Sequence, residues 1–140
     1  MIKNIFVVLH VITAAGWFGV ALMLTSISRS AAETSDRSIR DVGTKAVGMM
    51  NVFVVATFLF GLIAFLAGGG FAVYGPVYHT SLLLVLILIL VQFFMIRSGW
   101  ISLVKEGGAA ARKKVAMGVG IGHLLWLVVL ILMFSHYFAI

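Results

Sequence analysis

Four long apolar segments limit what this chain can fold into. They cover residues 5–27, 46–67, 79–96 and 115–138, and none of them contains an Asp, Glu, Lys or Arg. About 20 apolar residues cross the hydrocarbon core of a bilayer as one helix, and a helix satisfies its own backbone hydrogen bonds there. The chain is therefore predicted to be an all-α, polytopic membrane protein. Its four transmembrane helices are expected to form a single up-down bundle over residues 1–140.

The charged residues lie in two of the three connections. Segments 28–45 and 97–114 contain all four acidic residues and nine of the ten basic ones, with Lys3 as the exception. The positive-inside rule assigns both segments to the cytoplasmic side of a bacterial inner membrane and both chain ends to the outside. The net charge of +6 is thus explained by topology, and no nucleic-acid partner is expected. The third connection, "GGGFAVYGPVY" at 68–78, is uncharged and is predicted to be a tight turn.

Histidines are the side chains within the apolar segments that titrate near neutral pH. His10, His79 and His136 belong to three different helices and are predicted to share the outer side of the membrane. His123 is predicted to lie alone on the cytoplasmic side of the last helix. Ionisable side chains inside a membrane are costly and therefore indicate function. The structural alternative is an interface position beside Tyr78 or Tyr137, or, for His123, a hydrogen bond across helices.

Helical phase indicates which faces point into the bundle. At about 100° per residue, one stripe of the first segment contains His10, Thr13, Ala14, Trp17, Ala21 and Leu24. One side of the last segment contains Gly118, Gly122, Val129, Met133 and His136, with His123 about 100° from its centre. Two small-residue pairs predict close helix packing, namely Gly118 with Gly122 and Ala15 with Gly19.

Neutral imidazoles on facing helices have three uses in a membrane. They ligate haem iron from both sides, they bind copper together with a thioether such as that of Met133 or Met23, or they relay protons. The chain has no cysteine, which excludes thiolate metal sites and iron–sulfur clusters.

A haem also needs a flat apolar slot. Gly16 and Gly19 are predicted to leave room for the macrocycle, and Trp17 and Phe18 to line it. The alternative for the tryptophans is packing or anchoring at the membrane interface.

Two segments resemble a known family. The stretch "LHVITAAGWFG" at 9–19 resembles the first helix of the small bacterial membrane proteins grouped with HemJ-type protoporphyrinogen oxidases and CopD-like copper-resistance proteins. The stretch "HTSLLLVLILIL" at 79–90 resembles the start of their third helix, with Ser81 in the place of the family's lysine. The resemblance implies a four-helix plan and identifies His10 as a haem b ligand. The family's asparagine-glutamate-proline segment is absent from the last helix, where "GVGIGHLLWLVVLILM" stands.

These observations predict a haem b-binding protein of the inner membrane that acts in electron transfer or oxidoreduction, with a quinone or porphyrin-like partner. His10 is expected to be one axial ligand, His79 the second, and His136 the alternate second ligand. A copper-binding or copper-uptake protein using the same histidines, and a non-catalytic subunit, are the two alternatives. Association of the chain with itself is left open. No nucleophile–base pair, phosphate loop or carboxylate pair is present, which argues against hydrolysis and phosphoryl transfer.

Overall fold

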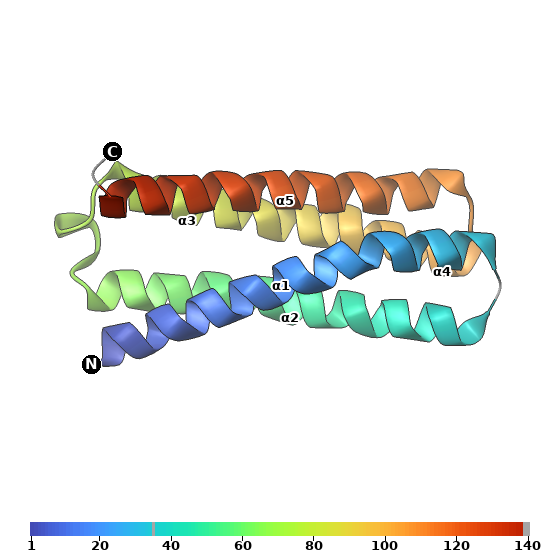
Figure 1. Ribbon diagram of the computed structural model, residues 1–140, viewed down its shortest axis with the longest axis horizontal. Helices are drawn as coiled ribbons and strands as arrows, with labels where there is room; N and C mark the ends of the chain where they lie inside the picture. The colour runs from blue at the N-terminus through green and yellow to red at the C-terminus, as the bar shows by residue number, and fades with distance from the viewer. Residues whose placement is uncertain (35, 139–140) are drawn as a thin grey trace.

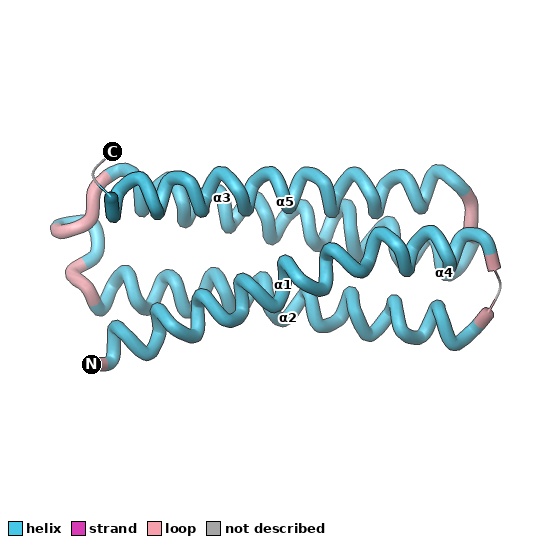
Figure 2. Tube along the Cα trace, viewed as in Figure 1, coloured by secondary structure: helices cyan, strands magenta, loops and turns pink. Residues whose placement is uncertain are grey.

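The chain is almost entirely helical. The computed structural model describes residues 1–34 and 36–138, with side-chain surroundings up to residue 135. In chain order it contains α1 (Ile2–Glu33), α2 (Arg37–Ala67), the 3₁₀ turn η1 (Gly70–Ala72), α3 (Pro76–Val91), the π-helical segment η2 (Gln92–Arg97), α4 (Ser98–Glu106) and α5 (Ala109–Phe138). Because α3, η2 and α4 follow one another without interruption, they form one rod from Pro76 to Glu106. Figure 2 shows that the loops lie only at the two ends of the bundle.

Four rods are long and apolar enough to cross a membrane, and their described parts contain 32, 31, 31 and 27 residues. At ~1.5 Å per residue they extend beyond a hydrocarbon core of about 30 Å. No strand occurs in residues 1–34 or 36–138. The prediction of an all-α, four-helix, multi-pass membrane protein is confirmed.

The predicted loops at 28–45 and 97–114 are wrong in their extent. α1 continues to Glu33 and α2 begins at Arg37, while α4 ends at Glu106 and α5 begins at Ala109. Hydropathy marks only the part of a helix that lies in lipid. A helix continues into the headgroup region, where its charged side chains are solvated and have good helix propensity.

The two helical hairpins pack side by side. α1 contacts α2 and α5, and α3 contacts the same two helices, so α1 and α3 occupy diagonal positions. Figure 1 shows both chain ends at one end of the bundle, and the α1–α2 and α4–α5 connections at the other. The charged residues of the two predicted loops therefore gather at one end of the molecule.

The fully buried residues of α1 and α5 lie toward the charged end of the bundle and not toward the end that holds the termini. The buried apolar cluster runs from Trp17 toward the charged end and includes Leu24, Met50, Ile96, Trp100, Leu103 and Val115. By contrast, no residue from 2 to 13 in α1 and none from 123 to 135 in α5 is fully buried. In the half of the bundle that contains the chain ends, the buried residues come mainly from α2 and α3 and include Ala64, Phe65, Ser81 and Val85.

Glycines allow α5 to approach its neighbours. A Cβ on Gly118 would lie 2.7 Å from Ile96 Cγ1, and a Cβ on Gly122 would overlap the Trp17 ring. The predicted close packing at Gly118 and Gly122 is therefore confirmed, while Val129 and Met133 are only partly buried and the side chain of His136 lies outside the described residues. The same prediction is wrong for Ala15 and Gly19 within this chain, because both lie on the exposed side of α1.

The uncharged turn between the hairpins is confirmed at 68–75. Gly69 and Gly70 have φ values of 111° and 58°, a region in which residues with a Cβ are strained. Pro76 then starts α3 at a position where a missing N–H costs no helical hydrogen bond.

Asp36 caps the N-terminus of α2 and makes stability depend on pH. Its Oδ1 accepts hydrogen bonds from the Ser38 backbone N and from Ser38 Oγ, both at 2.9 Å. These bonds, led by the one from the backbone, hold the pKa of the Asp36 carboxyl below its ordinary value. A lowered folded-state pKa adds stability above the unfolded-state pKa of about 3.9. That stability is lost as the pH falls through the folded-state pKa.

We therefore expect the melting temperature of the natural protein to fall more steeply below about pH 4 than that of Asp36→Asn, which keeps the cap without titrating. Thermal unfolding in detergent at low salt, followed by circular dichroism, measures the difference. Equal dependence of the melting temperature on pH in the two proteins would contradict the role of the Asp36 carboxylate as a titrating helix cap.

Candidate functional site

His10 is held by α2 in one defined orientation. Its Nδ1 lies 2.6 Å from the backbone O of Thr57. A carbonyl oxygen only accepts hydrogen bonds, so Nδ1 must carry the hydrogen and donate it. The neutral ring then has its lone pair on Nε2, the atom that is free to bind a metal.

A glycine makes this contact possible. The imidazole of His10 lies where a side chain at position 61 would be, because a Cβ on Gly61 would lie 2.7 Å from His10 Nδ1. One turn further along α1, Thr13 Oγ1 lies 3.0 Å from Thr57 Oγ1 and joins the same two helices. The backbone of α2 at Thr57 and Gly61 thus forms the surface against which the His10 ring packs.

His79 lies in the first turn of α3, between two aromatic rings. Its ring centroid is 5.8 Å from that of Phe65 and 4.8 Å from that of Phe71. Its Nε2 is buried and has no hydrogen-bond partner among the described residues. A buried nitrogen without a partner is costly and is uncommon unless a water, an ion or a cofactor completes it.

α2 brings the two histidines to the same side of the bundle. Gly61, which receives His10, and Phe65, which contacts His79, are four residues apart and so lie on successive turns of one helix face. The side chain of His136 lies outside the described residues, so the predicted alternate ligand has no described position. Within the described part of the chain, no three His, Cys, Asp or Glu side chains form a metal-binding group.

The predicted slot beside Gly16 and Gly19 does not form. The ring of Phe53 fills the space beside Gly16, where a Cβ would be 3.1 Å from its edge. Gly19 faces outward, with nothing within 4 Å of a Cβ position. Trp17 is a core residue with 1% of its surface exposed, and Phe18 packs on His123 at 4.6 Å between ring centroids. The i, i+3 spacing leaves the two glycines about 60° apart around α1, and only Gly16 lies at the contact with α2.

A polar layer crosses the middle of the bundle, with one residue from each rod. Trp17, Asn51, Gln92 and His123 each lie within one residue of the midpoint of their rod, and we call these four the midplane layer. Trp17 Nε1 donates to Gln92 Oε1 at 2.9 Å, and Gln92 Nε2 donates to Asn51 Oδ1 at 2.8 Å. Gln92 is fully buried and begins the π-helical segment. Such segments inside helices are frequent at functional sites.

Gln92 and Asn51 are not among the site residues predicted from the sequence. The available signal was an amide side chain near the middle of an otherwise apolar run, in "MMNVF" at 49–53 and "LVQFF" at 90–94. An amide in the hydrocarbon core requires hydrogen-bond partners, so each predicts a neighbour on another helix.

His123 belongs to this layer, which corrects two predictions. It lies at mid-depth rather than on the cytoplasmic side, and its ring contacts Trp17 and Phe18 of α1. The expected hydrogen bond across helices is absent among the described residues, since His123 Nε2 is buried without a partner. The approach of α5 to α1 through Gly122 explains this position, because it brings the neighbouring His123 against the same turn of α1.

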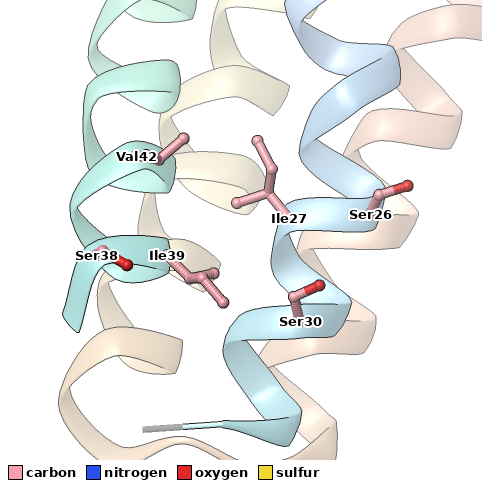
Figure 3. Close-up of a pocket in the computed structure, with 6 residues that line it drawn as sticks. All are labelled: Ser26, Ile27, Ser30, Ser38, Ile39 and Val42. Atoms are coloured by element: carbon pink, nitrogen blue, oxygen red, sulfur yellow. The ribbon is translucent and has the colours of Figure 1, made fainter. Parts of the chain in front are cut away.

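A shallow cleft of about 280 Å³ lies between α1 and α2 at their charged ends. Figure 3 shows its lining, which consists of Ser26, Ile27, Ser30, Ser38, Ile39 and Val42. The cleft offers hydroxyl groups over an apolar floor, but its lining contains no histidine or carboxylate. It therefore adds no ligand to the histidine site.

No known protein family, curated protein or solved structure matches this chain.

Proposed function

We propose that this protein binds haem b in the half of the bundle that contains the chain ends, with His10 as one axial ligand. The observation that carries the proposal is the hydrogen bond from His10 Nδ1 to the Thr57 carbonyl. Metal-ligating histidines nearly always donate their other ring N–H to a carbonyl or carboxylate, which fixes the tautomer and raises ligand basicity. His10 thus has the hydrogen-bonding pattern of a metal-ligating histidine, in which Nδ1 donates to a carbonyl and Nε2 carries the lone pair that would bind the metal.

His79 is the proposed second ligand. Its Nε2 is buried and lacks a partner among the described residues, and a bond to iron would satisfy it. His10 and His79 pack against residues on successive turns of α2. The resemblance of residues 9–19 to the first helix of HemJ-type proteins supports the same role for His10. His136 stays the alternate second ligand.

The donor set and its surroundings fit this group. Two neutral imidazoles are the usual ligands of a b-type haem, and the rings of Phe65 and Phe71 contact the His79 ring. When bound, haem b supplies one-electron exchange. The residues of the chain contribute the ligand orientation, the exclusion of water and an apolar surrounding. The function we propose is electron transfer or oxidoreduction in the membrane, with a quinone or a porphyrin-like molecule as partner.

We also propose the orientation and the membrane. Nine of the ten basic residues lie at the end of the bundle that carries the α1–α2 and α4–α5 connections. The positive-inside rule favours the cytoplasm for that end of a protein in the bacterial inner membrane. The histidine site then faces the outer side.

The visible absorption spectrum of the protein, purified in detergent from cells supplied with haem precursor, tests the proposal. We expect a Soret band in the oxidised protein and sharp α and β bands after reduction with dithionite. Folded protein without these bands would overturn it. Stoichiometric copper in such a colourless sample would instead support the copper alternative.

A further inference from the structure

Thr57 joins α2 to α1 through two of its own groups. Its backbone O lies 2.6 Å from His10 Nδ1, and its Oγ1 lies 3.0 Å from Thr13 Oγ1. His10 and Thr13 are three residues apart and so lie on one face of α1. Only 5% of the surface of Thr57 is exposed, so this contact between the two helices is closed to the surroundings.

The available hydrogens give the hydroxyl contact a direction. Thr13 Oγ1 lies 2.9 Å from Leu9 O and 3.1 Å from His10 O, and both carbonyl oxygens can only accept. Thr13 has one hydroxyl hydrogen, so that hydrogen is used within α1. In the contact between the helices Thr13 Oγ1 therefore accepts, and Thr57 donates a hydrogen that it shares with Phe53 O at 2.7 Å.

The same turn of α2 leaves the Thr57 carbonyl open to His10. Inside an α-helix a carbonyl oxygen accepts the N–H of the residue four positions further on, and its second lone pair stays available. At Thr57 that later residue is Gly61, and a Cβ on Gly61 would lie only 2.7 Å from His10 Nδ1. Because the glycine has no side chain, the imidazole reaches the carbonyl without displacing the helical hydrogen bond.

We propose that Thr57 is the positioning residue of the His10 site. Its hydroxyl holds α1 against α2 at the height and rotation at which His10 Nδ1 meets the Thr57 carbonyl. The inference rests on the proposed function, in which His10 Nε2 is a metal ligand, and it names the side chain that keeps this nitrogen free of hydrogen. A neutral imidazole can carry its hydrogen on either nitrogen, and the partner of one nitrogen decides which.

The purely structural role of a threonine in a membrane helix is a hydrogen bond back to its own helix. Thr80 of α3 shows that role, because its Oγ1 donates to Pro76 O at 2.9 Å and bonds to no other described residue. Thr57 makes the equivalent bond to Phe53 O and, in addition, the bond to Thr13. The second bond is the one that bears on the position of His10.

The tautomer of His10 in metal-free protein tests the proposal. It is measured by ¹⁵N NMR of histidine-labelled protein in detergent at about pH 8, where imidazole is neutral, and His10→Ala identifies the His10 signals. Thr57→Val removes the hydroxyl but keeps the shape of the side chain and the backbone carbonyl. We expect the ratio of the Nδ1–H to the Nε2–H tautomer to fall by up to about tenfold, the value of one hydrogen bond.

Two variants separate positioning from a general effect of losing a hydroxyl. Thr57→Ser keeps the donor and should retain the natural tautomer ratio. Thr80→Val is the matched control, since it removes a hydroxyl that bonds only within its own helix, and it should leave the ratio unchanged. Circular dichroism of each sample establishes that the protein is folded.

Three results overturn the proposal: an unchanged ratio in folded Thr57→Val, an equal change in Thr80→Val, or an Nε2–H tautomer in the natural protein. The sample contains no metal, so the test is separate from the visible spectrum that tests the proposed function. The expected NMR result without haem bands would overturn only the haem site. Haem bands with a tautomer ratio that ignores Thr57→Val would overturn only the role of Thr57.

Discussion

His10→Ala is expected to yield a folded protein that has lost its haem bands. The variant removes an imidazole whose tautomer is fixed by a backbone carbonyl, with Nδ1 at 2.6 Å from Thr57 O. Loss of a hydrogen-bond partner of a metal ligand already lowers affinity about 10–100-fold. Loss of the ligand itself should lower haem affinity by more than about 100-fold. Titration of apoprotein with haem, followed at the Soret band, measures this change.

Two further variants show whether the effect comes from ligation. His123→Ala removes a histidine of the midplane layer that packs on Phe18, and it should retain the haem bands. Gly61→Ala keeps the imidazole of His10 but places a methyl group 2.7 Å from its Nδ1. The haem affinity of this variant should therefore lie between those of the natural protein and His10→Ala. A His10→Ala protein with unchanged haem affinity would exclude His10 as a ligand.

Helical phase alone predicted much of the site. A spacing of seven residues puts His10 and Trp17 on one stripe of α1, and the stripe does face the bundle: Ala14, Trp17, Ala21 and Leu24 are all buried. Phase could not show which neighbour each residue would contact. His10 contacts the backbone of α2, whereas Trp17 donates to Gln92 on the third rod. This difference arises because α1 crosses the bundle obliquely, as Figure 1 shows, and a single helix does not encode its crossing angle.

Other features depended on neighbours that the sequence did not identify. Trp100 lies within segment 97–114, which the charge pattern places outside the apolar spans, yet only 2% of its surface is exposed. Charged residues only three to five positions away can still reach water from a helix whose opposite face is buried. The space beside Gly16 was read as free for a cofactor, although Phe53 of α2 fills it. A glycine indicates that something approaches closely, but not whether it is a ligand or a side chain.

Gly43→Val is expected to cause a large loss of stability at a position remote from the histidines. Gly43 is buried on α2, and the rigid six-membered ring of Trp100 occupies the space where its Cβ would lie. The ring cannot easily move, because Trp100 is enclosed and its Nε1 donates to Thr44 Oγ1 at 3.0 Å. Overpacking costs about 1–3 kcal/mol, and we expect the upper end, about 3 kcal/mol. Unfolding by SDS in mixed micelles, followed by circular dichroism, gives the change in free energy.

Gly48→Val is the matched control for this substitution. It lies five residues further along α2, is exposed, and has nothing within 4 Å of a Cβ position. Its unfolding free energy should change by less than about 0.5 kcal/mol. Trp100→Leu alone should cost less than the about 3–5 kcal/mol of a Trp→Ala change, because the leucine fills part of the cavity. In the Gly43→Val/Trp100→Leu double variant the valine methyls enter that cavity, so the combined loss should be smaller than the sum by about 1–3 kcal/mol. Strict additivity would show that Gly43 and Trp100 do not share this space, and that the close approach of α2 and α4 is not what requires a glycine at position 43.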